Sequence, residues 1–591
     1  MSIRRRVLGL VLTLGCSFLL VQQAGAAQTG RFDLLLKPSP EFSTALAKID
    51  TALAPILPPG ASLQRLANSA LLAVRNLNQA NGLRLATELE RRGLVEYVEP
   101  DYEVALLPST GQFFGEGEGD AEGEEDEKNW GLGAVHAQEA WQVTEGDPEL
   151  IVALLDTGAD LDHEDLVDNL WVNPGEIPGN GLDDDGNGYI DDIHGYNFCE
   201  GHGSPEDDYG HGSHTAGIVA AGHNGFGTVG VAPNVKLMPL KFIECSPRQG
   251  TISLAIEAIH YAVDHGARVI NNSWGIRHSV DGYRDVWGDT TPRALREAVE
   301  YANDHGVVFV ASAGNFQEDN DSVRIYPAGL DNSNLIAVTS TDSDDRFHSE
   351  VNHGNLTVHV AAPGKDIYSA WMKGGYSTIS GTSMAGPFVA GLAALLLSAD
   401  PGATPEEVRY AIMASVDRSE HLADYTLAGG RINAARALTK DYNQEEVALD
   451  NGTCDVLWVD AGCNDAVRVG NEVAVFAMAR TCNDDFAVDW TFTKTPKQAE
   501  GQVEVLERAG EAMTFVAEHA GTYVLQVCLQ GEQGGAVCDE LEVKVVEAGE
   551  DIPEVSCRGG GMCGVMGMTP GMASWPFVLL LLGLGLRRRH G

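Results

Sequence analysis

Apolar runs alternate with amphipathic stretches through the middle of the chain, from Asn129 to about Tyr442. The continuous apolar runs predict buried strands at 150–155, 235–242, 267–272, 306–312 and 334–340. Two amphipathic stretches, 251–266 and 293–306, end in Asp-His-Gly, which suits a helix C-terminus. Because apolar strands alternate with helices, we expect a doubly wound parallel α/β sheet with its site at the carboxyl ends of the strands.

The pattern changes on both sides of this α/β region. Residues 27–107 combine a strand-like run, helical stretches and a closing strand at 94–107, which predicts a small α+β unit. Residues 108–128 include eight acidic side chains among glycines, and such a self-repelling stretch predicts an exposed linker. Residues 445–548 contain short strands rich in valine and threonine, which predict an immunoglobulin-like β-sandwich.

Both ends of the sequence carry processing signals. Residues 1–26 have an arginine cluster, a short apolar stretch and small residues, the pattern of a secretory signal peptide. Cys16 could indicate a lipoprotein, but Thr13 stands where such a signal usually has leucine. Residues 549–591 run from a Gly/Cys-rich stretch through a short apolar segment to an arginine cluster, and they resemble the C-terminal sorting tails of Gram-negative surface proteins. The tail is either removed after export or retained as a membrane anchor.

The charge balance narrows the choice of partners. The 591 residues, enough for three or four domains, include 39 basic and 85 acidic side chains, a net charge of −46. Such a surface repels nucleic acid and anionic lipid and attracts cations such as calcium. We therefore expect no nucleic-acid partner, and membrane contact only through the C-terminal tail. The ten cysteines include no C-x-x-C pair, so zinc and thioredoxin chemistry have no support, and export favours disulfides.

Four polar motifs fall at predicted strand ends or helix starts, and each alone has another interpretation. Asp156 lies in Asp-Thr-Gly, an aspartic-protease signature, but that chemistry needs two carboxylates and the motif occurs once. His211 and His214 could bind a metal, but no third ligand stands in a matching motif. Asn315 follows a predicted strand. Ser383 precedes a helix apolar enough to cross a membrane, although its proline and small residues favour a buried core helix.

Taken together, the motifs resemble the subtilisin family of serine proteases. The segments DTGADLDHEDL, HGSHTAGIVAA, INNSWG, ASAGN and SGTSMAGPFVAG follow one another in the family's order, and the resemblance covers residues 129–442. It implies that Ser383 is the nucleophile, His211 the general base and acid, and Asp156 the residue that orients His211. Asn315 and the Ser383 backbone N–H would then stabilise the oxyanion, while His214 would be structural.

The same resemblance indicates how substrate is bound. It implies that Ser273, Trp274 and Gly275 form the edge strand that pairs with an extended substrate. Phe316 and Ile325 fall near the first specificity pocket of the family. Neither is acidic, so we expect medium or large apolar substrate side chains. After Ser383-Met384-Ala385 the chain has Gly386-Pro387-Phe388, where the family usually has Ser-Pro-His, and we expect this departure to affect packing more than chemistry.

The acidic stretch at 179–192 predicts a calcium site. Its spacing follows an EF-hand loop, with the ligands Asp183, Asp185, Asn187, Gly188 and Asp191. His194 stands where that loop has a bidentate glutamate, and Asp192 is a neighbouring substitute. A solvated acidic turn without metal is the alternative. The family resemblance adds a second calcium site, with Asp165 and Asn224 as ligands.

The N-terminal unit completes the prediction. Residues 27–107 resemble the family's inhibitory propeptide, whose removal in the acidic linker would release activity. The sequence therefore predicts an exported, calcium-stabilised serine endopeptidase, made as a zymogen and acting as a monomer on protein or peptide substrates. It would be secreted or held at the cell surface. The alternative is a catalytically inert, calcium-dependent surface adhesion protein.

Overall fold

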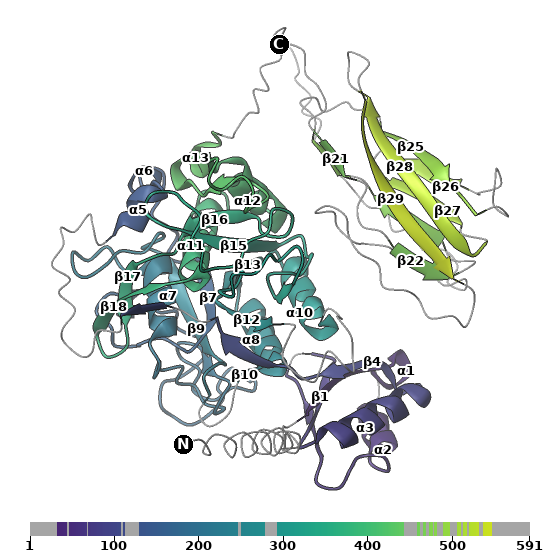
Figure 1. Ribbon diagram of the computed structural model, residues 1–591. Helices are drawn as coiled ribbons and strands as arrows, with labels where there is room; N and C mark the ends of the chain where they lie inside the picture. Colours follow the sequence, from purple (N-terminus) through teal and green to yellow (C-terminus); the bar gives the residue numbers. More distant parts are fainter. Residues whose placement is uncertain are drawn as a thin grey trace, which may run out of the picture. The chain divides into compact units, whose positions relative to one another are not determined.

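The computed structural model describes residues 32–441, apart from 44–45, 68, 108–109, 113–128, 246–249 and 278–291, and the strands and short turns between 458 and 546. The chain divides into two compact units, Met1–Asn443 and Gln444–Gly591 (Figure 1). The expected signal peptide 1–26, the acidic run of the linker and the C-terminal tail 549–591 lie outside the described residues.

The chain first forms a small antiparallel sheet covered by helices. Its strand order is β2-β3-β1-β4. The elements are β1 (Leu34–Pro38), α2 (Leu46–Leu53), β2 (Ser62–Arg65), β3 (Leu72–Arg75), α3 (Gln79–Arg91) and β4 (Val95–Pro100). One face of the sheet packs on α2 and α3 around buried leucines, as an α+β unit requires (Figure 1). The Asn78 side chain accepts the backbone N–H of Asn81 and caps α3.

The single closing strand expected at 94–107 is two strands in two different sheets. After β4 the chain leaves the small sheet, and β5 (Glu103–Leu106) joins a sheet with the order β10-β5-β12-β14. A further strand, β6 (Thr110–Gln112), pairs with β18 (Gly375–Ser380). The boundary at residue 107 is therefore corrected, because strand structure continues to Gln112, within the segment expected to be linker.

A nine-stranded sheet forms the centre of the first unit, with the order β19-β20-β16-β15-β13-β11-β7-β9-β8. Its strands are β7 (Ile151–Asp156), β8 (Tyr196–Asn197), β9 (Lys236–Lys241), β11 (Ala267–Asn272), β13 (Val308–Ser312), β15 (Leu335–Thr341), β16 (Val360–Pro363), β19 (Asp417–Arg418) and β20 (Gly430–Arg431). All neighbours are parallel except the edge pair β19–β20. The predicted parallel sheet with helices is confirmed.

Helices cover both faces of this sheet because successive strand residues point to opposite sides. Val152 and Leu154 of β7 share a buried cluster with α7 (His211–Ala220) and α11 (Thr382–Ala399). Ala153 and Leu155 share another cluster with α8 (Ile252–Asp264) and α10 (Arg293–Asp304). The glycines after α8 and α10 have φ of 83° and 73°, which confirms the predicted helix ends.

The helix α11 is long and apolar enough to cross a membrane, and it is the one such helix among the described residues. Its most apolar window is 83% buried inside the first unit. The prediction of a core helix is therefore confirmed. A disulfide joins Cys199 to Cys245, whose Cα atoms are 5.2 Å apart.

The second unit consists of strands alone in its described part (Figure 1). They form sheets with the orders β21-β24, β22-β29-β28-β25 and β23-β27-β26. Their bounds are β21 (Trp458–Asp460), β22 (Asp465–Arg468), β23 (Glu472–Phe476), β24 (Met478–Arg480), β25 (Val488–Lys494), β26 (Val505–Ala509), β27 (Ala512–Val516), β28 (Gly521–Gln530) and β29 (Ala536–Val546). An immunoglobulin-like sandwich stays a prediction for this unit.

Candidate active site

Asp156 and His211 form a buried, hydrogen-bonded pair. Asp156 is the last residue of β7 and His211 the first of α7, and Nδ1 of the imidazole lies 2.7 Å from Oδ1 of the carboxylate. The carboxylate also accepts the backbone N–H of Thr157 at 2.8 Å. Burial alone lowers the pKa of His211, but the charge and hydrogen bond of Asp156 outweigh it, so the pKa is raised above its usual value. The carboxylate thus fixes the proton on Nδ1 and leaves Nε2 as the basic nitrogen.

Ser383 contacts the residue that follows the adjoining strand, β11. Because β11 is the neighbour of β7, this residue, Ser273, lies beside Asp156 at the end of β7. The Ser383 hydroxyl donates to the Ser273 carbonyl at 3.2 Å, and the Ser273 hydroxyl donates to the Ser383 carbonyl at 3.0 Å. The Nε2 atom of His211 is buried and has no hydrogen-bond partner among the described residues. The nitrogen is therefore available to a nucleophile. In serine hydrolases the hydrogen bond between the serine hydroxyl and the histidine often forms only when substrate is bound.

The side chain of Asn315 is held beside the start of α11. Its Oδ1 accepts both the backbone N–H and the hydroxyl of Thr382, each at 2.9 Å. Nδ2 is consequently the donor end of the amide. A Cβ on Gly381 would lie 2.8 Å from Nδ2, so only glycine leaves room there. The backbone N–H of Ser383 belongs to the first turn of α11, where a helix favours negative charge.

His214 has a structural environment, as expected. It is fully buried, and its Nε2 lies 3.0 Å from the Ile367 carbonyl and 3.1 Å from the Ser377 carbonyl. These carbonyls belong to β17 (Ile367–Trp371) and β18, which the imidazole joins to α7. Burial lowers the pKa of His214 to about 3, so the ring is neutral at neutral pH.

The predicted substrate-binding residues occupy an edge that the chain itself covers. Ser273 leads directly into β12 (Trp274–Arg277), and β5 pairs with β12 antiparallel. On its other side β5 pairs with β10 (Gly250–Thr251). Ile325 is fully buried in β14 (Ile325–Tyr326), the other neighbour of β12, whereas Phe316 is only partly buried.

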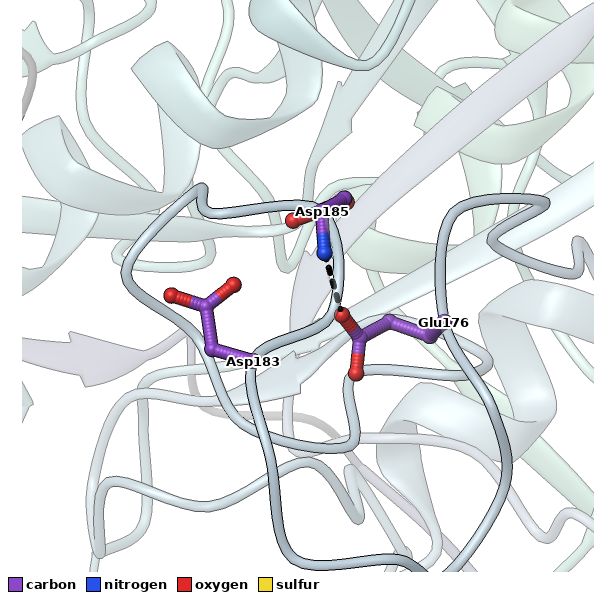
Figure 2. A group of neighbouring side chains, drawn as sticks. All are labelled: Glu176, Asp183 and Asp185. Atoms are coloured by element: carbon purple, nitrogen blue, oxygen red, sulfur yellow. Dashed lines mark hydrogen bonds between the residues drawn. The ribbon is translucent and has the colours of Figure 1, made fainter.

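Three carboxylates come together in the predicted calcium loop. Figure 2 shows Glu176, Asp183 and Asp185, whose ligand atoms all lie within 4.8 Å of one another. Among the described residues, no basic side chain forms an ion pair with any of them. Glu176 was missed by the sequence analysis because it precedes the spaced motif, and its exposure of 8% could not be inferred from the sequence. This donor set fits a hard, oxygen-preferring cation such as calcium.

The remaining residues of that loop have other partners. The Asp191 carboxylate accepts the backbone N–H groups of Asn180 and Gly181, and Asn187 donates to Asp185 and Asp192. Asp192, the substitute considered for the missing glutamate, is fully buried and accepts the Tyr261 hydroxyl at 2.5 Å. His194 contacts the Trp171 carbonyl at 2.8 Å. The structure thus gathers part of the predicted ligand set and adds Glu176.

The two residues of the second calcium site also lie together. Asp165 accepts the Asn224 side-chain amide at 3.0 Å and the backbone N–H of Thr228 at 3.0 Å. The Tyr376 hydroxyl donates to the same carboxylate at 2.8 Å. Asn224 therefore presents its nitrogen to Asp165, and its amide would have to turn over to present an oxygen to a cation.

Four groups meet at the carboxyl edge of the parallel sheet: the buried Asp-His pair, the serine at a helix start and the asparagine amide beside it. This arrangement defines a serine hydrolase of the subtilisin type. A model of the subtilase family matches residues 147–443, half of the chain. The chain belongs to this family, and the matched region is a serine endopeptidase domain.

The chain is similar to several known proteins and to solved structures. It is 36% identical to a thermophilic serine proteinase of Bacillus sp. (strain AK1), over 59% of this chain and 74% of the relative. It is 35% identical to thermitase of Thermoactinomyces vulgaris, over 53% and 96%. Subtilisin-like protease 1 of Plasmodium berghei (strain Anka) is 32% identical, and the match spans only 53% of its length. Fervidolysin of Fervidobacterium pennivorans, a keratinolytic enzyme, shares the fold, with a TM-score of 0.56, 20% identity and coverage of 88% of this chain and 79% of that one.

Proposed function

We propose that the protein is an exported serine endopeptidase, made as a zymogen and stabilised by calcium. The observation that carries this proposal is the 2.7 Å contact between His211 and Asp156 beside the Ser273–Ser383 pair. Ser383 attacks the substrate carbonyl while Nε2 of His211 takes its proton, and the protonated imidazole then passes this proton to the leaving amine. Water attacks the acyl-enzyme in the second half of the reaction, again with His211 as the base.

The other site residues take supporting roles. Asp156 orients His211 and stabilises the imidazolium. Nδ2 of Asn315 and the backbone N–H of Ser383 donate to the oxyanion, which carries the charge that develops in the transition state. The strand that begins at Ser273 and continues through Trp274 and Gly275 pairs with the extended substrate backbone.

Fluorophosphonate labelling tests the nucleophile. We expect the linker-cleaved protein to be labelled on Ser383, because an activated serine reacts with this probe, and the Ser383→Ala variant to remain unlabelled. Peptide mapping of the adduct identifies the residue. A folded protein from which residues 27–128 have been removed, and which takes up no label with calcium present, would favour the inert adhesion protein instead.

The N-terminal unit is an inhibitory propeptide in this proposal, and it acts in cis. Its strand β5 occupies the edge that a substrate would use, and β6 pairs with β18, which ends at Ser380 just before the nucleophile. Two carboxylates fasten it to the catalytic domain. Glu99 accepts the backbone N–H groups of Arg293 and Ala294 at the start of α10, at 2.9 and 3.0 Å.

The second carboxylate, Asp101, binds the start of the neighbouring helix. It accepts the backbone N–H of Ser253 at 2.9 Å and the hydroxyl of the same residue at 2.7 Å, and it forms an ion pair with Arg75.

The sequence after β5 supports cleavage in the acidic linker, because the residue that follows Leu107 is proline. A peptide bond to proline is a tertiary amide without N–H, so we expect this bond to resist hydrolysis and the cut to fall within 113–128.

Release of the cleaved propeptide should depend on pH. Burial raises the pKa of Glu99 to about 7, against a usual value near 4.5, and Glu297 adds to this rise while Arg293 opposes it. Protonation thus favours the bound state, so this contribution is fully present below about pH 4.5 and is lost as the pH rises through about 7. We expect the propeptide to dissociate faster at pH 8 than at pH 5, as measured by native mass spectrometry of cleaved Ser383→Ala protein.

Two variants separate this effect from general pH sensitivity. Glu99→Gln should bind the propeptide with much less dependence on pH, because the titrating group is gone. Glu96→Gln, on the same strand but exposed, is the matched control and should retain the pH dependence. Equal pH dependence in all three proteins would contradict the role of Glu99.

Calcium should stabilise the catalytic domain through Glu176, Asp183 and Asp185. When bound, the ion would neutralise the mutual repulsion of these carboxylates. We expect a chelator to lower the Tm by about 5 °C, the effect of a ligand present well above its Kd. Asp185→Asn should lose most of this response in differential scanning calorimetry. Asp344 is an exposed acid in another loop, and the Asp344→Asn variant should keep the response to the chelator. A Tm that does not change with calcium in any of these proteins would disprove the site.

Export follows from the sequence alone. The segment 1–26 would direct secretion, and 549–591 would sort the protein to the cell surface or be removed. In this proposal the protein acts as a monomer on protein or peptide substrates. It is therefore secreted or displayed at the cell surface.

A further inference from the structure

The loop that carries Asn315 is bound by a buried asparagine from a distant part of the chain, Asn352. The loop covers residues 313–320 after β13, whereas Asn352 lies between β15 and β16. The backbone N–H of Asn352 donates to the Gly314 carbonyl at 2.8 Å. Its side-chain Oδ1 accepts the backbone N–H of Phe316 at 2.7 Å. Asn352 therefore binds the residue before Asn315 and the residue after it.

A second asparagine extends these contacts to the start of the loop. Nδ2 of Asn352 donates to Oδ1 of Asn320 at 2.8 Å, and Nδ2 of Asn320 donates to the Ala313 carbonyl at 2.8 Å. Oδ1 of Asn352 also accepts the backbone N–H of Glu318 at 3.3 Å. Because a backbone N–H only donates and a carbonyl only accepts, these partners fix the orientation of both amides. The two side chains are 0% and 1% exposed, so water competes little for their hydrogen bonds.

The loop needs such contacts because its conformation is not one that the backbone prefers. Gln317 has a φ of 58°, in the left-handed region that residues with a side chain seldom adopt. Gly314 has a φ of 118°, and a Cβ there would lie 2.8 Å from Nδ2 of Asn352, so the amide packs against the bare face of the glycine. A loop with two such residues keeps its shape only where the surrounding structure holds it.

The position of Asn315 consequently depends on two sets of contacts. Its Oδ1 accepts the backbone N–H and the hydroxyl of Thr382, which sets the direction of Nδ2. The two other asparagines hold the backbone from which this side chain extends. An oxyanion donor is effective only at about 3 Å from the oxygen that becomes charged, and a misplacement of about 1 Å can cost 10²-fold in rate.

We propose that Asn352 and Asn320 are positioning residues that hold the oxyanion donor Asn315 in place. Neither touches the substrate, and both act through the backbone of residues 313–318. The inference rests on the proposed function, because it takes Asn315 to donate to the oxyanion. Since all these contacts lie within the protein, the donor is preorganised and no rearrangement is needed when charge develops on the substrate oxygen.

Steady-state kinetics of two alanine variants test this role. The protein is the full-length chain cleaved in its acidic linker and freed of residues 27–128, and the probe is a fluorogenic peptide with an apolar residue before the cleaved bond. We expect Asn352→Ala to lower kcat by about 10-fold to 100-fold and to change KM by less than about twofold, because the donor acts mainly in the transition state. Asn320→Ala should lower kcat by only about 10-fold, because the contact between Asn352 and Phe316 remains.

Asn334→Ala is the matched control for both variants. Asn334 is also fully buried, and its Nδ2 donates to the carbonyls of Val299 and Val307 at 3.3 and 2.9 Å. It precedes β15 and so lies at the amino edge of the sheet, opposite the edge that carries Asn315. Its loss should lower the Tm but leave kcat within about twofold of the unmodified enzyme. If Asn352→Ala lowers kcat no more than this control does, the inference is wrong.

A double-mutant cycle separates positioning from a general structural effect. Asn315→Ala alone should lower kcat by about 10²-fold to 10³-fold, as loss of the corresponding donor does in subtilisin itself. In the Asn315→Ala background, Asn352→Ala should change kcat by less than about threefold, because the group that it positions is gone. Two effects that multiply would show that Asn352 acts by another route, and would overturn the inference.

The outcomes distinguish this inference from the proposed function. If the unmodified protein hydrolyses the peptide and folded Asn352→Ala protein keeps the same kcat, the inference fails while the proposed function stands. If the unmodified protein neither hydrolyses the peptide nor takes up fluorophosphonate on Ser383, both fail. Circular dichroism checks folding, and if Asn352→Ala does not fold, Asn320→Ala takes its place in the same cycle.

Discussion

Replacing Ser383 by alanine is expected to lower kcat for peptide hydrolysis by about 10⁶-fold, the scale that subtilisin itself shows for loss of its nucleophile. The variant lacks the oxygen that attacks the substrate, and only the oxyanion donors and substrate binding remain to assist water. The fold should be retained, because alanine keeps the Cβ and the substitution removes only one weak side-chain hydrogen bond, the one to Ser273. The measurement is the rate of a fluorogenic peptide on linker-cleaved protein.

Ser398→Ala is the matched control for this experiment. It makes the same chemical change on the same helix, α11, but in its last turn, where the hydroxyl donates to Ala394 and accepts from the backbone of Asp147. Its kcat should stay within about twofold of the unmodified enzyme. A Ser383→Ala variant that kept about a tenth of the activity would show that another group is the nucleophile.

Asp156→Asn should lower kcat by about 10⁴-fold at neutral pH and change KM little. The carboxylate now accepts from Nδ1 of His211 at 2.7 Å, whereas an amide nitrogen would donate to that atom and favour the tautomer with its proton on Nε2. A proton on Nε2 prevents this nitrogen from acting as the base. Steady-state kinetics with separate kcat and KM values distinguish this effect from weaker substrate binding.

Asp168→Asn removes a charge from an exposed position between β7 and α7 and serves as its control. It should leave kcat unchanged within experimental error. If Asp156→Asn and Asp168→Asn had similar small effects, the buried contact with His211 would have no role in orienting the base. Circular dichroism of both variants checks that the fold is intact.

Local patterns predicted the elements of the catalytic domain well because each strand is an uninterrupted apolar run. The strand expected at 267–272 is β11 at the same residues, and the helix expected at 293–306 is α10, which ends two residues before its glycine. The strand ends then place Asp156 and Asn315 at the same edge of the sheet, as the order of apolar runs indicated. In these cases, local hydrophobicity and tertiary structure favour the same conformation.

Features that depend on contacts between distant segments could not be predicted in this way. Glu176 lies outside the spaced acidic motif and joins it only because the loop folds back. The pairings of β5 with β12 and of β6 with β18 join residues far apart in the sequence, and no local pattern reports them. The partner of Cys199 was equally undetermined, because nine other cysteines were available.

The two carboxylates that bind the helix starts have a consequence for the rate of folding. Glu99 and Asp101 are two residues apart, whereas the helix starts they contact, at Ala294 and Ser253, are separated by about forty residues. A short segment thus fixes a contact between distant parts of the chain and reduces the entropy that closing the intervening loop must overcome. In the proposed zymogen, removal of this segment would leave the domain without a template for refolding. The persistence of the cleaved enzyme would then be governed by how slowly it unfolds.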